Sequence, residues 1–242
     1  FYDLVILDEA QRIKNDSAII SRAIKKIPRE YSWALTGTPL ENSIEDIASI
    51  FGFVNPKTIS KYDFPKDVKR KIDPYTIRRR KRDVLKDLPD VIEQDIRIRL
   101  NDEQWITYEN TRIERFKYIK ELEKKERISG ILALITELKK IVNFDPITEK
   151  SSKLDYVKDI LEEKLLLDEK VIIFSQYVET LEYLKSNLFS HEVNIYHGGL
   201  SQTERDKIIK NFKDSKNSEV LLISLKAGGV GLNLQEASTL IL

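Results

Sequence analysis

Short runs of consecutive apolar residues recur near both ends of the chain, and a polar or glycine-containing turn follows each of them. The clearest runs are residues 4–7, 33–35, 171–174 and 220–223, with residues 193–196 and 239–242 as further candidates. Uninterrupted apolar positions, as opposed to alternating ones, are typical of parallel strands that are covered on both faces. We therefore expect these segments to be buried parallel strands.

Amphipathic helical patterns lie between these strands. Residues 17–27 carry apolar side chains at helical spacing, and Pro28 ends the pattern because proline cannot continue a helix. Similar patterns cover residues 44–51, 153–166, 178–188 and 203–212. Ser201 and Glu204 have the spacing of a capping box before the last of these helices. Strands that alternate with helices at both ends predict an α/β fold with parallel sheets.

The middle of the chain has a different pattern. Residues 101–144 contain no strand pattern, and their apolar residues form two helical stripes, which predict two amphipathic helices with a break near Ser129 and Gly130. We expect Trp105, Tyr108 and Phe116 to form the core of this helical insert and not to stack on bases. The polar residues 145–152 are expected to be a linker.

Composition excludes several classes of protein. With 242 residues, 41% of them hydrophobic, the chain has enough apolar material for packed cores. The absence of cysteine excludes disulfides, thiolate zinc sites and a cysteine nucleophile. The net charge of +1 means that a nucleic acid must be bound by a local basic patch. Because the chain also lacks methionine, we expect it to be an internal part of a longer protein.

The strongest chemical signal is the acidic pair Asp8 and Glu9, which directly follows an apolar run. A strand that ends in adjacent carboxylates places both at the carboxyl edge of a sheet, where ligands of α/β proteins bind. Hydrolysis of ATP needs a carboxylate to hold Mg²⁺ and a group to orient the attacking water. Asp8 suits the first role, through a water molecule, and Glu9 the second. The alternative is a solvated pair of acids, which the following Ala10 and Gln11 disfavour.

Thr36, Gly37 and Thr38 follow the second apolar run, one strand–helix–strand unit after the acidic pair. Threonine hydroxyls at this place can hydrogen-bond the carboxylates at the neighbouring strand end. They would then couple the state of a bound nucleotide to the rest of the protein. The alternative is an ordinary turn containing glycine and proline.

Three segments are candidates for contact with nucleic acid. Residues 66–86 hold ten basic and three acidic residues, and such clusters neutralise phosphates without reading sequence. Residues 227–233 contain three glycines, which allow a close approach of the backbone to a phosphate. Residues 196–199, followed by Arg205, can present N–H groups and a guanidinium to a phosphate. Solvated charge and tight turns are the alternative explanations, and a phosphate of ATP or an acidic segment of a partner are alternative targets of the basic residues.

Taken in order, these motifs resemble those of the SWI/SNF-like ATPases of helicase superfamily two. Residues 8–11 resemble motif II and residues 35–42 resemble motif III, and residues 78–84 with Leu88 and Pro89 are similar to the basic stretch that follows motif III. Residues 171–177 resemble motif IV, and residues 196–212 resemble the block that begins with His-Gly. Residues 224–234 resemble motif V. The strings at motifs III and V are far more specific than an isolated acidic pair.

The resemblance implies an α/β fold of two RecA-like parallel-sheet lobes, both incomplete in this chain and joined by a helical insert. The expected boundaries are 1–90 for the first lobe with its basic stretch, 91–150 for the insert and linker, and 151–242 for the second lobe. The cofactors implied are ATP and Mg²⁺, and the implied partner is duplex DNA, together with proteins bound to it. The DNA would be moved without full strand separation.

The resemblance also implies a role for each matching residue. Asp8 and Glu9 would be catalytic. Nucleotide sensing and coupling would fall to Gln11, Thr36, Gly37 and Thr38. Contact with DNA would fall to Arg78, Arg79, Arg80, Lys81, Ser175, Gln176, Arg205, Lys226, Gly228, Gly229 and Gly231.

Two signatures of the family are missing from the printed sequence. It contains no Gly-Lys-Ser/Thr phosphate-binding loop and no motif VI arginine finger. We therefore expect the 242 residues by themselves to hydrolyse no ATP. Two alternatives stay open: another superfamily-two motor that acts on RNA or separates strands, and a DNA-binding protein without ATPase activity. The composition favours a cytoplasmic protein of a prokaryote over a nuclear one.

Overall fold

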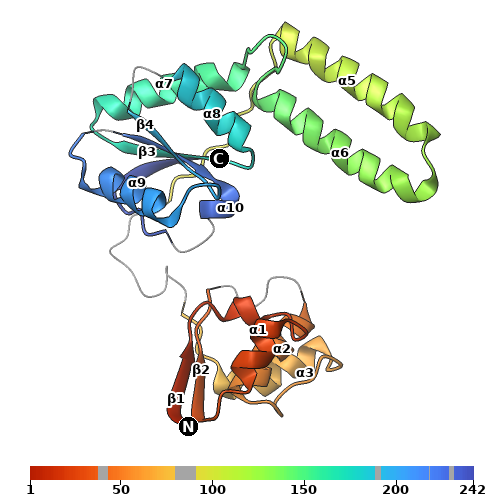
Figure 1. The fold of residues 1–242 in the computed structure, drawn as a ribbon, viewed down its shortest axis with the longest axis vertical. Coiled ribbons are helices and arrows are strands. Elements are labelled where there is room, and N and C mark those ends of the chain that lie inside the picture. Colours follow the sequence, from red (N-terminus) through yellow and green to blue (C-terminus); the bar gives the residue numbers. More distant parts are fainter. Residues whose placement is uncertain (38–42, 80–90, 189–191, 218, 229–231) are drawn as a thin grey trace. The chain divides into compact units, whose positions relative to one another are not determined.

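The computed structural model describes residues 1–37, 43–79, 91–188, 192–217, 219–228 and 232–242. The chain forms two compact units, Phe1–Ile92 and Glu93–Leu242, and each is described by itself (Figure 1). Among the described residues, no helix is long and apolar enough to cross a membrane.

The first unit is built on a short parallel sheet. Its elements are β1 (Tyr2–Leu7), the 3-10 helix η1 (Ala10–Ile13), α1 (Ile19–Lys25), β2 (Arg29–Ala34), α2 (Ile44–Val54), α3 (Pro65–Ile72) and the 3-10 helix η2 (Asp73–Tyr75). β1 pairs with β2 in parallel, with Ile6 opposite Trp33. The predicted strands are confirmed, but β2 begins at Arg29, four residues before the apolar run.

One face of this two-stranded sheet is covered and the other is exposed. Ala10, Ile13, Ile50 and Phe53 are buried and pack with the half-buried side of β1 and β2. The opposite face presents exposed apolar residues, namely Leu4, Ile6, Tyr31 and Trp33. The prediction that both faces of these strands are covered is therefore wrong for this unit, because the described helices that pack on the sheet cover one face only.

The second unit contains a four-stranded parallel sheet with helices on both faces. Its elements are α5 (Asp102–Glu121), α6 (Lys124–Asn143), α7 (Ser152–Leu166), β3 (Lys170–Ser175), α8 (Val178–Asn187), β4 (Val193–Tyr196), α9 (Gln202–Asp214), β5 (Val220–Ser224), α10 (Leu225–Gly228) and β6 (Ala237–Ile241). The strand order is β4-β5-β3-β6, and all the pairings are parallel.

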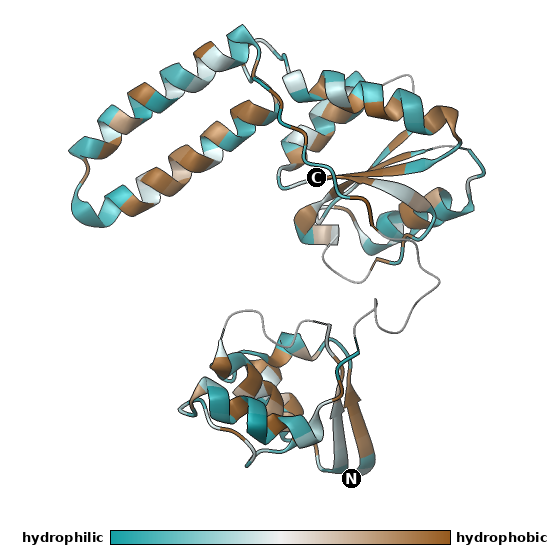
Figure 2. Cartoon of the chain, turned by 180° about the vertical axis from the view of Figure 1, so that it is seen from behind, coloured by the Kyte–Doolittle hydropathy of each residue, from teal (hydrophilic) through white to brown (hydrophobic). Residues whose placement is uncertain are grey.

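The central strands of this sheet are buried on both sides, as their uninterrupted apolar runs predict. Alternate residues of β3 point to opposite faces, so Val171 packs with α7 and α8 whereas Ile172 packs with Phe212 of α9. Figure 2 shows the hydrophobic residues concentrated along these strands. The predicted capping box of Ser201 and Glu204 is present at the start of α9.

α5 and α6 form a helical hairpin that extends from the sheet (Figure 1). The predicted break near Ser129 and Gly130 is wrong, because the chain leaves the first helix at Leu122 and starts the second at Lys124. Gly130 lies inside α6, where a Cβ atom would come within 3.1 Å of Ile119 and 3.2 Å of Leu122. The glycine therefore allows the two helices to approach each other and does not end a helix.

Two of the three aromatic residues expected in the core of the hairpin are exposed. Trp105 and Phe116 are 54% and 46% exposed, whereas Ile119 and Leu134 are buried between the helices. Trp105 stacks on Tyr108, with ring centroids 6.0 Å apart. The prediction that the aromatic residues form the core is wrong for Trp105 and Phe116, because helical spacing shows that residues share a face but not which face is covered.

A buried glutamine joins the base of the hairpin to the rest of the second unit. Gln104 is fully buried, and its side-chain N–H donates to the carbonyl of Ile141 at 2.9 Å. Its side-chain oxygen accepts from the backbone N–H of Ser152 at 2.8 Å and from the Ser152 hydroxyl at 3.0 Å. These bonds connect the start of α5, the end of α6 and the start of α7.

The expected linker after α6 is a short hydrogen-bonded turn. Asp145 is fully buried, and its carboxylate accepts from the hydroxyls of Thr107 at 2.9 Å and Thr148 at 3.0 Å. The ring of Phe144 stacks on Tyr183 of α8 with centroids 4.3 Å apart. The polar composition of this segment supplies the groups that hold the turn in place.

Candidate functional site

The acidic pair lies at the carboxyl edge of β1, as its position after an apolar run predicts. β1 ends at Leu7, and Asp8 and Glu9 are both exposed in the turn that leads into η1. Glu9 has φ 52 and ψ 48, a left-handed conformation that is uncommon for residues with a side chain. Its backbone N–H donates to Oδ1 of Asp8 at 2.8 Å, which fixes one carboxylate relative to the other.

A chain of side-chain hydrogen bonds connects the acidic turn with the end of β2. The hydroxyl of Thr36 donates to the side-chain oxygen of Gln11 at 2.7 Å, and the side-chain N–H of Gln11 donates to the Glu9 carboxylate. The sequence suggested a direct hydrogen bond from the Thr36 hydroxyl to a carboxylate. In the structure the hydroxyl is instead connected to the Glu9 carboxylate through the side chain of Gln11. The backbone joins the same two segments, because Ala10 N–H donates to Leu35 O at 2.9 Å.

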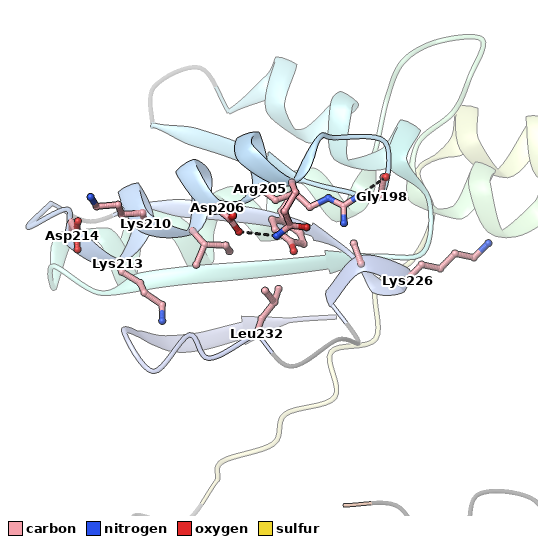
Figure 3. Close-up of a pocket in the computed structure, with 12 residues that line it drawn as sticks. Gly198, Arg205, Asp206, Lys210, Lys213, Asp214, Lys226 and Leu232 are labelled. Carbon is pink, nitrogen blue, oxygen red and sulfur yellow. Dashed lines mark hydrogen bonds between the residues drawn. The ribbon is translucent and has the colours of Figure 1, made fainter. Parts of the chain in front are cut away.

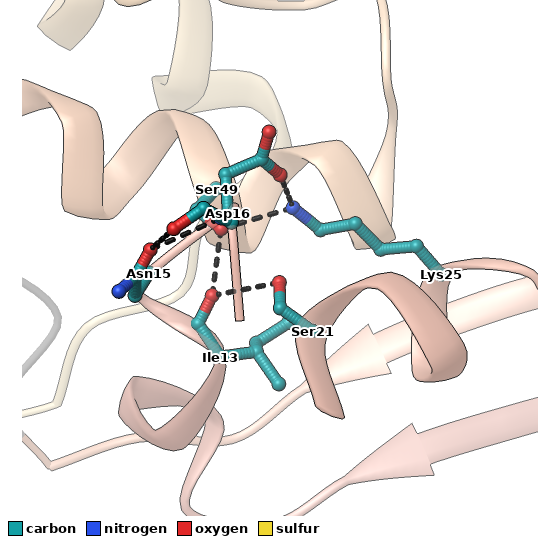
Figure 4. Close-up of polar contacts among 7 residues, drawn as sticks. Ile13, Asn15, Asp16, Ser21, Lys25 and Ser49 are labelled. Atoms are coloured by element: carbon teal, nitrogen blue, oxygen red, sulfur yellow. Dashed lines mark hydrogen bonds and ion pairs between the residues drawn. The ribbon is translucent and has the colours of Figure 1, made fainter. Parts of the chain in front are cut away.

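A buried polar cluster holds η1 against α1 and α2. The carbonyl of Ile13 accepts from the hydroxyls of Ser49 at 2.6 Å and Ser21 at 3.3 Å. Lys25 donates to the Ser49 hydroxyl at 2.9 Å and pairs with Asp16 (Figure 4). This ion pair and its hydrogen bond hold the pKa of Asp16 below its ordinary value. The cluster fixes the turn that carries Glu9, although nothing in the local sequence pattern indicates it.

The acidic turn has the features of a magnesium site that uses few protein ligands. Asp8 is exposed, and no group of three metal-binding side chains gathers anywhere in the described part of the chain. Mg²⁺ usually keeps several water molecules and binds one or two carboxylates together with substrate phosphates. An exposed carboxylate at the end of a strand fits this mode, with Asp8 accepting a hydrogen bond from a water molecule on the ion.

In the second unit, the carboxyl end of β3 carries Ser175 and Gln176. Ser175 is buried, and its hydroxyl accepts from the backbone N–H of Tyr177 at 3.2 Å. Gln176 is exposed. Ser175 therefore shapes the turn, whereas Gln176 is available to a ligand.

Arg205 holds the turn that follows β4. Its guanidinium donates to the carbonyl of Gly198 at 2.6 Å and to that of Leu200 at 3.0 Å. Within the same turn, the backbone N–H of Gly199 donates to Nδ1 of His197 at 3.1 Å. Two of the donors of Arg205 are thus occupied by the backbone, so it positions the turn as well as adding positive charge.

A cavity of about 600 Å³ lies between α9 and α10 and brings two predicted DNA contacts together. Arg205 and Lys226 both line it, and so do Lys210 and Lys213 near the C-terminal end of α9 (Figure 3). Asp206 and Asp214 also line this cavity and partly offset its positive charge.

Gly228 lies at the end of α10, close to the sheet. A Cβ atom there would come within 2.7 Å of the Phe174 ring and 2.9 Å of Ile223. Glycine is therefore required at this position for packing, independently of any phosphate. Lys226, two residues earlier, is exposed.

Several predicted site residues lie outside the described residues, namely Thr38, Arg80, Lys81, Gly229 and Gly231. Of the rest, a Cβ atom at Gly37 would have no atom of the described segments within 4 Å, and Arg78 and Arg79 are exposed.

Two protein-family models match this sequence. The SNF2-related domain matches residues 2–147, and the helicase conserved C-terminal domain matches residues 152–242. This chain therefore belongs to the SNF2-related family, and the resemblance seen in its motifs is confirmed.

Similar proteins come from bacteria, archaea and eukaryotes. An uncharacterized ATP-dependent helicase of Mycoplasma pneumoniae is 35% identical over 99% of this chain and 25% of its own length. The putative ATP-dependent helicase/translocase YwqA of Bacillus subtilis is 33% identical over 99% of this chain and 29% of its own length. The chain thus spans between a quarter and a third of these relatives.

A solved structure confirms the fold class. The SWI2/SNF2 ATPase core of Sulfolobus solfataricus in complex with dsDNA is 30% identical, with a TM-score of 0.57 over 98% of this chain and 56% of that chain. The fold is accordingly α/β with parallel sheets, and its two units resemble RecA-like lobes.

Proposed function

We propose that this chain is the central part of an ATP-driven motor that moves along duplex DNA without separating its strands. The observation that carries the proposal is the hydrogen-bonded path from Glu9 through Gln11 to Thr36. It joins the acidic turn to the threonine turn within one unit. Glu9, which would orient the attacking water, is thereby connected by hydrogen bonds to the segment at Thr36, which would respond to the state of a bound nucleotide.

Each residue of this turn has a defined task in the proposed reaction. Asp8 would hold Mg²⁺ through water, and the bound ion would neutralise charge on the phosphates of ATP. Glu9 orients the attacking water, and its carboxylate is itself held by Gln11. Because Gln11 also accepts from Thr36, a shift of either turn changes the position of the other.

The comparisons support duplex DNA as the partner. The Sulfolobus solfataricus core resembles 98% of the length of this chain, and its structure is described in complex with dsDNA. A human relative that is 28% identical over 98% of this chain is named chromodomain-helicase-DNA-binding protein 1. Within the chain, the described candidates for contact with the DNA backbone are Arg78, Arg79, Gln176, Arg205 and Lys226.

The test is ATP hydrolysis by the full-length protein with duplex DNA, single-stranded DNA or RNA added. We expect duplex DNA to stimulate turnover most, and the Glu9→Gln variant to lose about 10²-fold or more. Glu30→Gln is the matched control, because Glu30 is an exposed glutamate on β2 of the same unit. Stimulation chiefly by RNA would assign the protein to the other helicase motors. No hydrolysis by a folded protein that binds DNA would leave a DNA-binding role alone.

The 242 residues alone give a second test of the same proposal. They contain no Gly-Lys-Ser/Thr sequence, so we expect no ATP turnover above that of the Glu9→Gln variant. Turnover above that of the Glu9→Gln variant would contradict this expectation, because it would show that hydrolysis does not require the missing phosphate-binding sequence.

A further inference from the structure

A second cavity, of about 460 Å³, lies where the helical hairpin meets the carboxyl end of β3. Lys139 and Asn143 of α6 line one side and Lys153 of α7 another. Ser175, Gln176 and Tyr177 at the end of β3 complete its polar part, and apolar side chains line the remainder. The cavity therefore combines side chains of the hairpin with the sheet edge at which ligands of parallel α/β proteins bind.

The charges of this cavity have one sign. Its lining side chains include two lysines and no aspartate or glutamate, in a chain with 41 basic and 40 acidic residues. The larger cavity beside α9 is lined by both signs. The nearby carboxylate of Glu179 is already paired with Lys140 at 2.8 Å. The second cavity is therefore suited to an anion.

The two lysines are held differently. The ammonium of Lys153 donates to Oδ1 of Asn143 at 2.9 Å, and the Asn143 amide in turn donates to the Thr180 hydroxyl at 3.1 Å. Partial burial lowers the pKa of Lys153, which means that its ammonium is incompletely hydrated. Lys139 is exposed and forms no ion pair with any residue in the described segments. One cation is thus oriented in advance, and the other is available.

We propose that this cavity binds a backbone phosphate of the duplex DNA, so that the base of the helical hairpin forms part of the DNA interface. The proposal rests on the function proposed above. Lys139 and Lys153 supply the positive charge, and the side-chain amide of Gln176 lies at the same cavity to donate a hydrogen bond. The contact is independent of base sequence, because it involves only the phosphate.

The experiment measures duplex binding by the full-length protein, by fluorescence anisotropy at several salt concentrations. Each phosphate contact contributes about 0.9 to the slope of log K against log salt. The Lys139→Ala/Lys153→Ala variant loses this one phosphate contact, so it should lower the slope by about 1 and raise Kd about tenfold at 0.1 M salt. Lys124→Ala/Lys125→Ala is the matched control, since both residues are exposed lysines at the start of α6. The control should change the slope far less.

Lys139→Gln separates the role of charge from that of folding. This change removes no hydrogen bond among the described residues, so the fold should be intact, and the slope should still fall, by up to about 1. Restoration of the slope by Lys139→Arg would support a phosphate contact. If the wild type binds DNA but the slope is unchanged in both the folded Lys139→Gln variant and the double variant, the proposal is overturned. Failure of the wild type to bind duplex DNA would instead overturn the proposed function.

Discussion

Replacement of Gln104 by leucine tests whether the buried hydrogen bonds at the base of the hairpin hold it to the second unit. The side chain is fully buried and bonds to the Ile141 carbonyl and to the Ser152 N–H. Both partners lie at helix ends, where backbone groups have no intrahelical partner. Leucine has nearly the same volume but can form none of these bonds.

The expected loss of stability follows from these two backbone groups. Each buried polar group that is left without a partner costs about 1–3 kcal/mol. The greater apolarity of leucine returns about 1 kcal/mol. We therefore expect the free energy of unfolding to fall by about 1–5 kcal/mol, which at a urea dependence of about 2 kcal/mol per M lowers the unfolding midpoint by about 0.5–2.5 M.

Tryptophan fluorescence can follow this unfolding specifically. The chain has two tryptophans, so a Trp33→Phe background leaves Trp105, next to the mutated residue, as the reporter of the hairpin. Gln235→Leu is the control, because it makes the same chemical change at an exposed glutamine of the same unit. A Gln104→Leu midpoint within about 0.3 M of the control would refute the role assigned to these hydrogen bonds.

Three further predictions concern single side chains. Lys170 is buried and donates to the carbonyls of Phe212, Lys213 and Ser215 at the end of α9. Lys170→Met should therefore lower the free energy of unfolding, measured by thermal unfolding, by about 2–4 kcal/mol. Lys216→Met, at an exposed lysine, is the control and should change it little. Hydrogen bonds from Ser201 hold the pKa of Glu204 below its ordinary value, and such a carboxylate stabilises the fold at neutral pH and loses this effect as the pH falls through the lowered pKa. The difference in Tm between the wild type and Glu204→Ala should therefore shrink in acid, and a difference independent of pH would contradict this account. Thr36→Val removes the hydrogen bond to Gln11, and the DNA-stimulated kcat of the full-length protein should fall about fivefold with little change in KM for ATP. Thr36→Ser should restore kcat, and an equal loss in both variants would argue against a role of the hydroxyl.

The parts of the fold that could be predicted from sequence are those that depend on neighbouring residues. The uninterrupted apolar runs of β3 and β5 predict strands that are buried on both faces, and both strands are, because other elements pack on each face of the sheet. The position of Asp8 and Glu9 at a strand end is likewise local. The capping box of Ser201 and Glu204 is detectable because its two members are three residues apart.

The features that sequence reasoning missed depend on contacts between distant segments. The sequence around Gly130 resembles a helix break, but the glycine is needed because Ile119 of α5 and Leu122, which follows α5, pack closely against it. Nothing near Arg205 in the sequence indicates that it would bond to the carbonyl of Gly198. The cavity at the base of the hairpin likewise forms only when α6, α7 and the end of β3 meet.

The same reasoning explains the exposed face of the first unit. An apolar run predicts a strand with two apolar faces, and β1 has both. The sequence of the run cannot specify which helices will cover each face. In this chain the helices between residues 10 and 54 cover one of them, and Ile6 and Trp33 stay exposed on the other.

The most direct test of the account is displacement of a third strand from a triplex by the full-length protein and ATP. A motor that follows duplex DNA without separating its strands should release the third strand, leave the underlying duplex paired, and lose this activity in the Glu9→Gln variant. Separation of the duplex into single strands, or ATP hydrolysis without any release of the third strand, would contradict the account.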